Sequence, residues 1–131
     1  MGEQVMTMIK EGIPTVSVFG VPVCKWGMKE TVAYLTEVVA AKTPHHVITA
    51  NPIMMMAAIE NPEYKAMMKT AELIVPDGTG LVWAAQKGGD PVTERVPGYD
   101  LLHELMKQGE RRSWKVYLLG AAPDVVKETA R

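Results

Sequence analysis

One carboxylate in this sequence stands where an enzyme built on a parallel sheet would place a general base. Residues 73–75 form a short apolar run with the length and branching of a buried parallel strand. Pro76 cannot continue a central strand, so the chain turns there and Asp77 follows the end of the strand. Because open α/β sheets bind ligands at this end of their strands, Asp77 is a candidate general base. The alternative is that it caps the helix that follows Gly80.

Two other predicted strands end in residues that suit a polar ligand. Thr49 and Asn51 stand at the end of one, and Gly120 follows the other. The carboxyl ends of parallel strands meet at one edge of a sheet, so we expect these residues to lie near Asp77. Helices that begin there present free N–H groups to anions, which favours a phosphorylated ligand. Asn51 before Pro52 also has the form of a helix N-cap, and that alternative stays open.

A guanidinium lies in the irregular segment 93–98, which is rich in Pro and Gly. Arg95 there can bind a diphosphate through paired hydrogen bonds. The alternative is an exposed arginine paired with its neighbour Glu94.

Other motifs that carry chemistry are absent from the sequence. The turn at 120–123 lacks the G-x-G-x-x-G pattern of dinucleotide sites, and the glycines after Asp77 are not followed by the Lys of a P-loop. The three histidines have no metal-ligand spacing, and no serine stands in a G-x-S-x-G turn. Methionines at 54–56, 67 and 68 recur at helical spacing, and we predict that they fill the core.

Composition limits the protein class. The chain has 131 residues, 47% of them hydrophobic, and a net charge of −1, which fits one globular domain and gives no basic surface for nucleic acid. A single cysteine, Cys24, fits a reducing compartment. Residues 1–12 have no apolar core of a signal peptide, and no apolar run approaches the ~20 residues of a membrane helix. We therefore expect a cytoplasmic protein.

The order of predicted elements indicates an α/β fold with a Rossmann-like, mostly parallel sheet and helices on both faces. A flexible segment at 1–14 precedes a single domain at 15–131. That domain should begin with an edge hairpin near 15–23. Strands follow at 46–49, 73–75 and 115–119, and helices at 28–41, 52–59, 62–69, 81–86 and 99–108 and from 123.

The last predicted helix is only about two turns long, and parallel sheets rarely end in an unfinished crossover. We therefore expect the sheet to be incomplete at its C-terminal side and the chain to be the front part of a larger protein. An incomplete sheet leaves an open edge, which a second copy of the chain can cover to form a homo-oligomer.

Three motifs together closely resemble the WecG/TagA/CpsF glycosyltransferases. These are Thr49-Ala50-Asn51, then Val75-Pro76-Asp77-Gly78-Thr79-Gly80, then Glu94-Arg95-Val96-Pro97-Gly98-Tyr99-Asp100. The opening Phe19-Gly20-Val21-Pro22-Val23 and the later Tyr117-Leu118-Leu119-Gly120 are also similar to that family. The resemblance covers the chain from about Val16 onward.

The resemblance implies an inverting hexosyltransferase of wall teichoic acid or related cell-surface polysaccharide synthesis. It would move N-acetylmannosamine from UDP-N-acetylmannosamine to undecaprenyl-diphosphate-linked N-acetylglucosamine, with no metal or other cofactor. Its partners would be the UDP-sugar donor and a lipid-linked acceptor, which implies peripheral association with the inner face of the plasma membrane.

By the same resemblance, Asp77 matches the proposed general base, Thr49 and Asn51 the polar substrate contacts, and Arg95 a phosphate or substrate contact. Gly78 and Gly120 complete the predicted substrate-binding residues. The chain departs from the family at Ala121-Ala122, where relatives often have a further glycine.

Two other functions remain open from the sequence. The first is a non-catalytic or truncated α/β module that binds a nucleotide sugar. The second is a fragment of a nicotinamide-dependent oxidoreductase, which the missing glycine motif disfavours.

Overall fold

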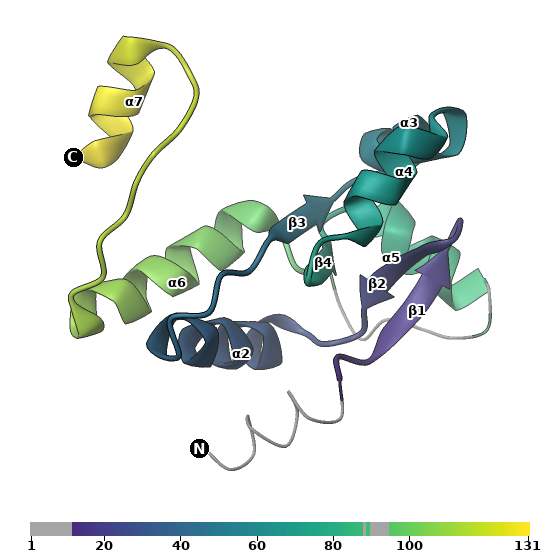
Figure 1. Ribbon diagram of the computed structural model, residues 1–131, viewed down its shortest axis with the longest axis horizontal. Coiled ribbons are helices and arrows are strands. Elements are labelled where there is room, and N and C mark those ends of the chain that lie inside the picture. Colours follow the sequence, from purple (N-terminus) through teal and green to yellow (C-terminus); the bar gives the residue numbers. More distant parts are fainter. Residues whose placement is uncertain (1–11, 88, 90–94) are drawn as a thin grey trace.

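The computed structural model describes residues 12–87, 89 and 95–131 (Figure 1). Of the predicted flexible segment at 1–14, residues 1–11 lie outside this part of the chain. The elements are, in order, β1 (Thr15–Val18), β2 (Val21–Cys24), α2 (Met28–Ala40), β3 (Val47–Ala50), α3 (Pro52–Glu60), α4 (Pro62–Lys69), β4 (Leu73–Pro76), α5 (Thr79–Lys87), α6 (Gly98–Arg112) and α7 (Pro123–Ala130).

The predicted hairpin near the start of the domain is confirmed. β1 and β2 pair antiparallel, with Thr15 opposite Cys24 and Val18 opposite Val21. The two-residue turn between them, Phe19-Gly20, has φ of 53° and 82°. Two consecutive positive φ values match the right-handed twist of the strands that a tight hairpin joins.

β3 and β4 form a short parallel pair, in register from Val47 opposite Leu73 to Ala50 opposite Pro76. All four residues of β4 are buried, as expected for a strand covered on both faces. The α/β class is therefore confirmed. Within the described residues, however, parallel pairing is limited to these two strands, and the other sheet is the antiparallel hairpin.

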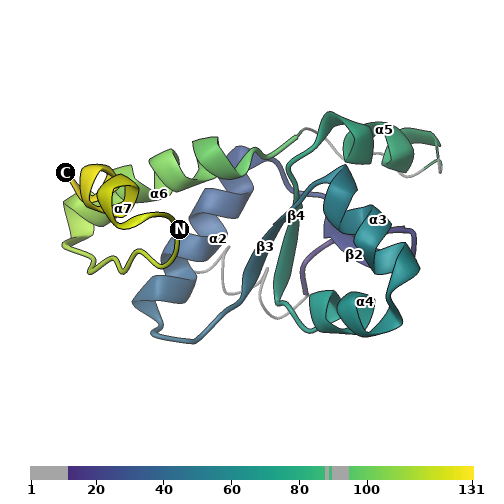
Figure 2. The same cartoon turned by 90° about the horizontal axis from the view of Figure 1, so that it is seen from above.

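Helices cover both faces of the β3–β4 pair, as predicted. Leu73 and Val75 pack with Leu35 and Val38 of α2 and Leu101 of α6, whereas Ile74 points the other way. Ile74 packs in a second cluster with residues of the hairpin, α3, α4 and α5. Figure 2 shows α2 and α6 on one side of the strands and α3, α4 and α5 on the other. The alternation of side chains along β4 thus divides the core into two halves.

The two Asn-Pro sequences begin helices as predicted. The Asn51 side chain accepts a hydrogen bond from the Met54 N–H at 3.0 Å, which caps α3. The Asn61 side chain accepts from the N–H groups of Glu63 and Tyr64, which caps α4. Each proline then occupies the first turn, where no intrahelical N–H is needed.

The prediction that the methionines fill the core is half right. Met55 and Met68 are almost fully buried, but Met56 is 55% exposed and Met67 is 44% exposed. α3 carries apolar residues on all sides, so helical periodicity could not separate its inner face from its outer face.

The predicted strand at 115–119 is wrong. α6 continues four residues past its predicted end at 108, and the chain leaves it through Ser113 in the left-handed region. Residues 114–120 then form an irregular connection that runs toward α7, away from β3 and β4 (Figure 1). A strand exists only where a neighbour accepts its backbone hydrogen bonds, and in the described structure this segment lies beside none. Tyr117 and Leu119 are accordingly 86% and 90% exposed.

Candidate functional site

Three segments that are far apart in the sequence meet at the carboxyl end of β3 and β4. Ala50 and Pro76 are opposite each other at the end of the pair, and the Asp77 N–H donates to the Ala50 carbonyl at 2.9 Å. The Val96 N–H donates to the Pro76 carbonyl at 2.7 Å. The backbone therefore joins residues 49–51, 76–78 and 95–98, and we call these three segments the β3–β4 rim.

Thr49 lies directly against the first residue of α6. A Cβ added to Gly98 would stand 3.1 Å from both Thr49 Oγ1 and Thr49 Cγ2. The half-buried Thr49 side chain and the N-terminus of α6 are thus in contact, and a larger residue at position 98 would separate them. Gly98 was not among the predicted site residues, although it stands in the same motif as Arg95.

Gly78 allows the two strand ends to approach each other. A Cβ at position 78 would lie 2.6 Å from Pro52 Cδ, closer than side chains pack. The Pro52 ring is rigid and begins α3, so the turn after β4 can fit beside it only without a side chain. The geometry gives Gly78 a packing role, and substrate contact by this residue stays a prediction.

Asn51 is the N-cap of α3, which was one of the two roles that the sequence allowed for it. Its Oδ1 atom is engaged by the Met54 N–H, and the residue is half-buried. The side-chain NH₂ group has no recorded hydrogen bond to any residue in the described part of the chain, so capping and ligand binding are compatible.

Asp77 is half-buried and precedes the start of α5. The carbonyl of Gly78, not that of Asp77, accepts the hydrogen bonds from the Leu81 and Val82 N–H groups. Gly78 thus holds the N-cap position, and Asp77 is one residue earlier in the chain. A carboxylate there is favoured by the partial positive charge at the helix N-terminus.

Arg95 is exposed and is held at the rim by its neighbour. Val96 is fully buried and bonded to Pro76, which fixes the backbone of Arg95 beside the end of β4. The backbone of Arg95 therefore lies near the turn that carries Asp77. The alternative pairing with Glu94 lies outside the described residues.

Gly120 is not at the rim. It is exposed, has a φ of 105°, and a Cβ added to it would meet no atom within 4 Å. The prediction that it shares the edge with Asp77 depended on a strand at 115–119, and that strand does not form here. Of the predicted site residues, the structure therefore brings together Thr49, Asn51, Asp77, Gly78 and Arg95, and leaves Gly120 apart.

Three helices begin at the rim. α3 follows Asn51, α5 follows Gly78 and α6 follows Pro97. Each N-terminus carries about half a positive charge, so together they favour a bound anion. The sequence predicted the start of α6 at residue 99. That this start lies close to the starts of α3 and α5 is seen only in the folded structure.

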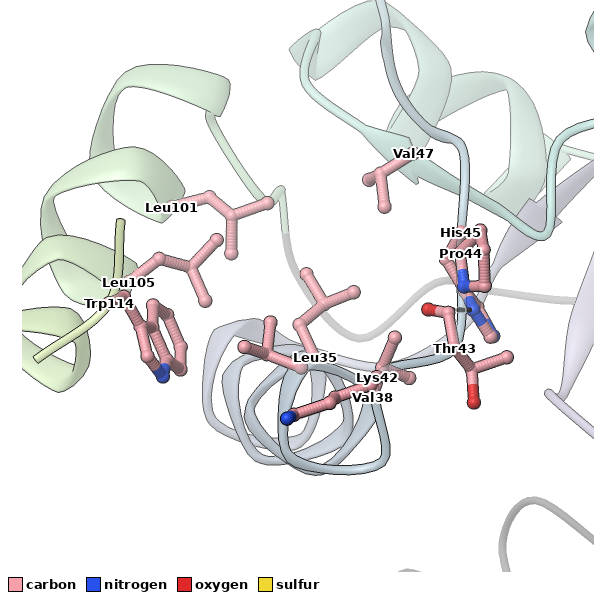
Figure 3. A pocket seen from close by; sticks show the side chains of 11 residues that line it. Leu35, Val38, Lys42, Thr43, Pro44, His45, Val47, Leu101, Leu105 and Trp114 are labelled. Carbon is pink, nitrogen blue, oxygen red and sulfur yellow. Dashed lines mark hydrogen bonds between the residues drawn. The ribbon is translucent and has the colours of Figure 1, made fainter. Parts of the chain in front are cut away.

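A cavity of the described structure lies away from the rim. It measures about 500 Å³ and lies between α2, residues 42–47 and α6 (Figure 3).

Two other kinds of reactive side chain in the described residues are the buried cysteine and the possible metal ligands. Burial raises the pKa of the Cys24 thiol to about 11, which suits a core residue and not a nucleophile. No three His, Cys, Asp or Glu side chains among residues 12–87, 89 and 95–131 are grouped as metal ligands.

None of the described helices is long and apolar enough to span a membrane.

The model of the glycosyl transferase WecG/TagA/CpsF family matches residues 16–131, which includes all three segments of the rim. The chain belongs to this family. A relative from Bacillus spizizenii, named N-acetylglucosaminyldiphosphoundecaprenol N-acetyl-beta-D-mannosaminyltransferase, is 37% identical over 83 residues, 63% of this chain and 32% of the relative. A relative of the same name from Staphylococcus aureus is 38% identical over 80 residues. These residues make up 61% of this chain and 32% of the relative.

The figures for the two relatives show how much of a family member the chain resembles. The matched part spans about a third of the length of the curated relatives. The activity and the substrates of a whole family member are therefore a proposal for this chain.

Proposed function

We propose that the β3–β4 rim is the reaction centre of an inverting N-acetylmannosaminyltransferase. The sugar moves from UDP-N-acetylmannosamine to N-acetylglucosamine carried on undecaprenyl diphosphate. Membership of the family and the names of the two relatives support the reaction class and the lipid-linked acceptor. The donor nucleotide and the polymer that the product enters, teichoic acid or a related surface polysaccharide, follow from the family resemblance alone.

One observation carries the proposal. Hydrogen bonds at 2.9 Å and 2.7 Å join the turns that carry Asn51, Asp77 and Arg95 at one end of a parallel pair. A carboxylate, an amide and a guanidinium are the groups that a sugar hydroxyl and a diphosphate require. Residues spread over much of the chain thus lie at the position where α/β folds bind their ligands.

Asp77 is the general base in this scheme. Inversion takes place in one displacement, in which the acceptor hydroxyl attacks the anomeric carbon as the bond to UDP breaks. Asp77 accepts the hydroxyl proton as the new bond forms, which typically contributes ~10²–10⁴-fold in rate. Thr49 and Asn51 orient the sugars through hydrogen bonds.

The leaving UDP carries the electron pair of the broken bond as negative charge on its diphosphate. Arg95 and the N-termini of α3, α5 and α6 supply positive charge at the same edge. We expect the reaction to need no metal or other cofactor. We also expect the protein to work at the inner face of the plasma membrane, where a lipid-linked acceptor would be presented.

The test is a transfer assay with UDP-N-acetylmannosamine and a lipid diphosphate that carries N-acetylglucosamine. Asp77→Asn should lower turnover by ~10²–10⁴-fold and leave the affinity for UDP within about threefold. Glu63→Gln, the same change at an exposed carboxylate in the first turn of α4, is the matched control and should leave both quantities unchanged. Full turnover by Asp77→Asn would remove Asp77 from the mechanism.

The alternative is a nucleotide-sugar-binding module without catalysis. The position of Gly120 favours it, because one predicted phosphate contact is absent from the rim in this structure. Under this alternative the chain binds UDP but transfers no sugar, with or without Asp77. The same assay therefore separates the two functions.

A further inference from the structure

An exposed aromatic ring lies beside the rim, and the proposed mechanism does not use it. Tyr99 is the second residue of α6, and its side chain is 73% exposed. The residue before it, Gly98, lies against Thr49, so α6 begins beside β3 (Figure 1). Side chains of a helix lean toward its N-terminus, and that of Tyr99 therefore leans toward the rim. Tyr117 is also exposed, but it lies in the connection that runs away from β3 and β4.

The ring of Tyr99 is held by His103, four residues further along α6. The two ring centroids are 4.3 Å apart and the ring planes are inclined at 41°. The Nδ1 atom of His103 lies 2.9 Å from the Tyr99 carbonyl oxygen and donates to it, since a carbonyl only accepts. A centroid separation this short places the imidazole against one face of the phenol ring. The opposite face stays open to solvent, as the 73% exposure of the side chain requires.

A carboxylate follows this ring directly in the sequence. Asp100 is exposed and lies in the same first turn of α6. A carboxylate accepts hydrogen bonds from hydroxyl groups and repels phosphate. The start of α6 thus combines an open aromatic face with an acceptor for hydroxyl donors.

This combination fits a pyranose ring. The face of an aromatic ring is negatively polarised, so it attracts the C–H groups that line one face of a pyranose. The hydroxyl groups around the edge of the same pyranose are donors for a neighbouring carboxylate. A phosphate group is a poorer fit at this position, because Asp100 repels it.

We propose that Tyr99 is the stacking platform for an N-acetylhexosamine ring that reacts at the β3–β4 rim, with Asp100 as an acceptor for its hydroxyl groups. The identity of the sugar rests on the proposed function, in which the donor and the acceptor each carry such a ring. The three segments of the rim contain no aromatic residue, so the stacking face comes from α6. Stacking restrains the orientation of the sugar relative to Asp77, which favours the displacement.

Saturation-transfer NMR tests the platform without any turnover. The aromatic protons of the protein are irradiated, and the saturation that reaches the ring protons of a bound sugar is measured. N-acetylglucosamine 1-phosphate represents the acceptor sugar and N-acetylmannosamine 1-phosphate the donor sugar, each in a separate sample. Circular dichroism checks that every variant is folded.

We expect the wild type to transfer saturation to at least one of the two sugar phosphates, and the one that responds identifies the sugar. Tyr99→Ala should reduce this signal about fivefold or more, because it removes the stacking face. Tyr117→Ala, the same change at a tyrosine that is 86% exposed and away from the rim, should leave the signal unchanged. Equal signals from the wild type and Tyr99→Ala, or none from the folded wild type, would overturn the proposal.

Conservative variants separate stacking from a hydrogen bond of the phenol hydroxyl. Tyr99→Phe and Tyr99→Trp keep an aromatic face and should retain the signal within about twofold. A loss in Tyr99→Phe as large as that in Tyr99→Ala would overturn stacking. Asp100→Ala should lower the signal about threefold through the lost acceptor, and an unchanged signal would remove Asp100 from the site.

Titration with UDP excludes a different occupant of the platform, since uracil can also stack on tyrosine. Tyr99→Ala should bind UDP within about twofold of the wild type, because UDP carries no hexosamine. Weaker binding of UDP by Tyr99→Ala, with unchanged signals from both sugar phosphates, would overturn the proposal in favour of a platform for the base.

The transfer assay then relates the platform to the reaction. Tyr99→Ala should raise the KM for the substrate whose sugar stacks about fivefold or more and leave kcat within about twofold. If the wild type transfers no sugar but the NMR results hold, the platform stands and the proposed function fails. If the wild type transfers sugar and Tyr99→Ala leaves both KM values unchanged, the proposed function stands and the platform fails.

Discussion

The backbone N–H of Val96 donates a 2.7 Å hydrogen bond to the carbonyl of Pro76. This bond joins the end of β4 to a residue twenty positions further along the chain, with α5 between them. Val96 is fully buried, so its position is fixed by packing as well as by the bond. Arg95 and Asp77 are the exposed or half-exposed neighbours of this buried pair, which explains how one edge acquires both a cation and a carboxylate.

Substitution of Gly78 should destabilise the protein through the contact with Pro52. An alanine Cβ at 2.6 Å from Pro52 Cδ forces the turn and α3 apart, which we expect to cost about 1–3 kcal/mol in the free energy of unfolding. Urea denaturation measures this change in the free energy of unfolding. Gly80→Ala is the control, because its Cβ would stand at 3.3 Å from Pro52 Cγ and alanine favours the helix, so its change should stay within about 1 kcal/mol. Equal costs for the two variants would contradict the close approach at position 78.

Asn51 variants separate capping from ligand binding. Asn51→Ala removes the acceptor for the Met54 N–H and should cost about 0.5–2 kcal/mol of stability, whereas Asn51→Asp keeps the cap and should cost little. If Asn51 also binds the donor, Asn51→Asp should weaken UDP-sugar binding at unchanged stability, because an anion replaces an NH₂ donor. Asn61→Ala removes the equivalent cap of α4 and should lower stability alone. Unchanged binding in a stable Asn51→Asp would leave Asn51 as a cap only.

Cys24 should be unreactive in the folded protein. Burial raises its thiol pKa to about 11, so at pH 8 only about one thiol in a thousand is ionised, and that group is also covered by the core. Alkylation by iodoacetamide should be slow in buffer and fast in denaturant. Because the folded-state pKa is raised, the protonated thiol stabilises the fold below about pH 9, and this contribution is lost as the pH rises toward 11. Rapid alkylation of folded protein at pH 8 would contradict the packing of β2.

Glu72 should make stability depend on acid pH. Its carboxylate accepts the His46 backbone N–H at 2.7 Å, and this bond lowers the pKa of the carboxyl below its ordinary 4.5. The contribution is therefore present above pH 4.5 and is lost as the pH falls through the lower folded-state value. Thermal unfolding of Glu72→Gln should show a shallower loss of melting temperature on acidification than the wild type does. Parallel curves below pH 4.5 would show that this bond does not contribute to stability.

Local signals in the sequence were sufficient for much of the fold. The Asn-Pro pairs located the starts of α3 and α4, because a cap and a proline in the first turn act within a few residues. The apolar run 73–75 located β4, since a short run of this kind leaves few alternatives to a buried strand. The strand extends one residue further than predicted, because Pro76 is its last residue and lies opposite Ala50. From these two elements the meeting of Asn51 and Asp77 at one edge could be predicted.

The features that the sequence did not predict depend on contacts between distant residues. The residues 115–119 favour a strand, but they do not show whether the edge of another strand lies beside them. The predicted strand was therefore wrong. The sequence could not predict which face of α3 is exposed, because methionine and isoleucine occur on both faces of this helix. The contact between Gly98 and Thr49 required the path of α6, which only the folded chain defines.

Calorimetric titration of the protein with UDP tests the central claim most directly, with Asp77→Asn and Arg95→Ala measured alongside. We predict that the wild type and Asp77→Asn bind UDP with affinities within about threefold, because Asp77 acts on the acceptor and not on the diphosphate. Arg95→Ala should bind at least tenfold more weakly, since it removes a charge-assisted contact to the diphosphate. Equal binding by all three proteins, or no binding by folded wild type, would contradict the assignment of the β3–β4 rim as the site of the donor.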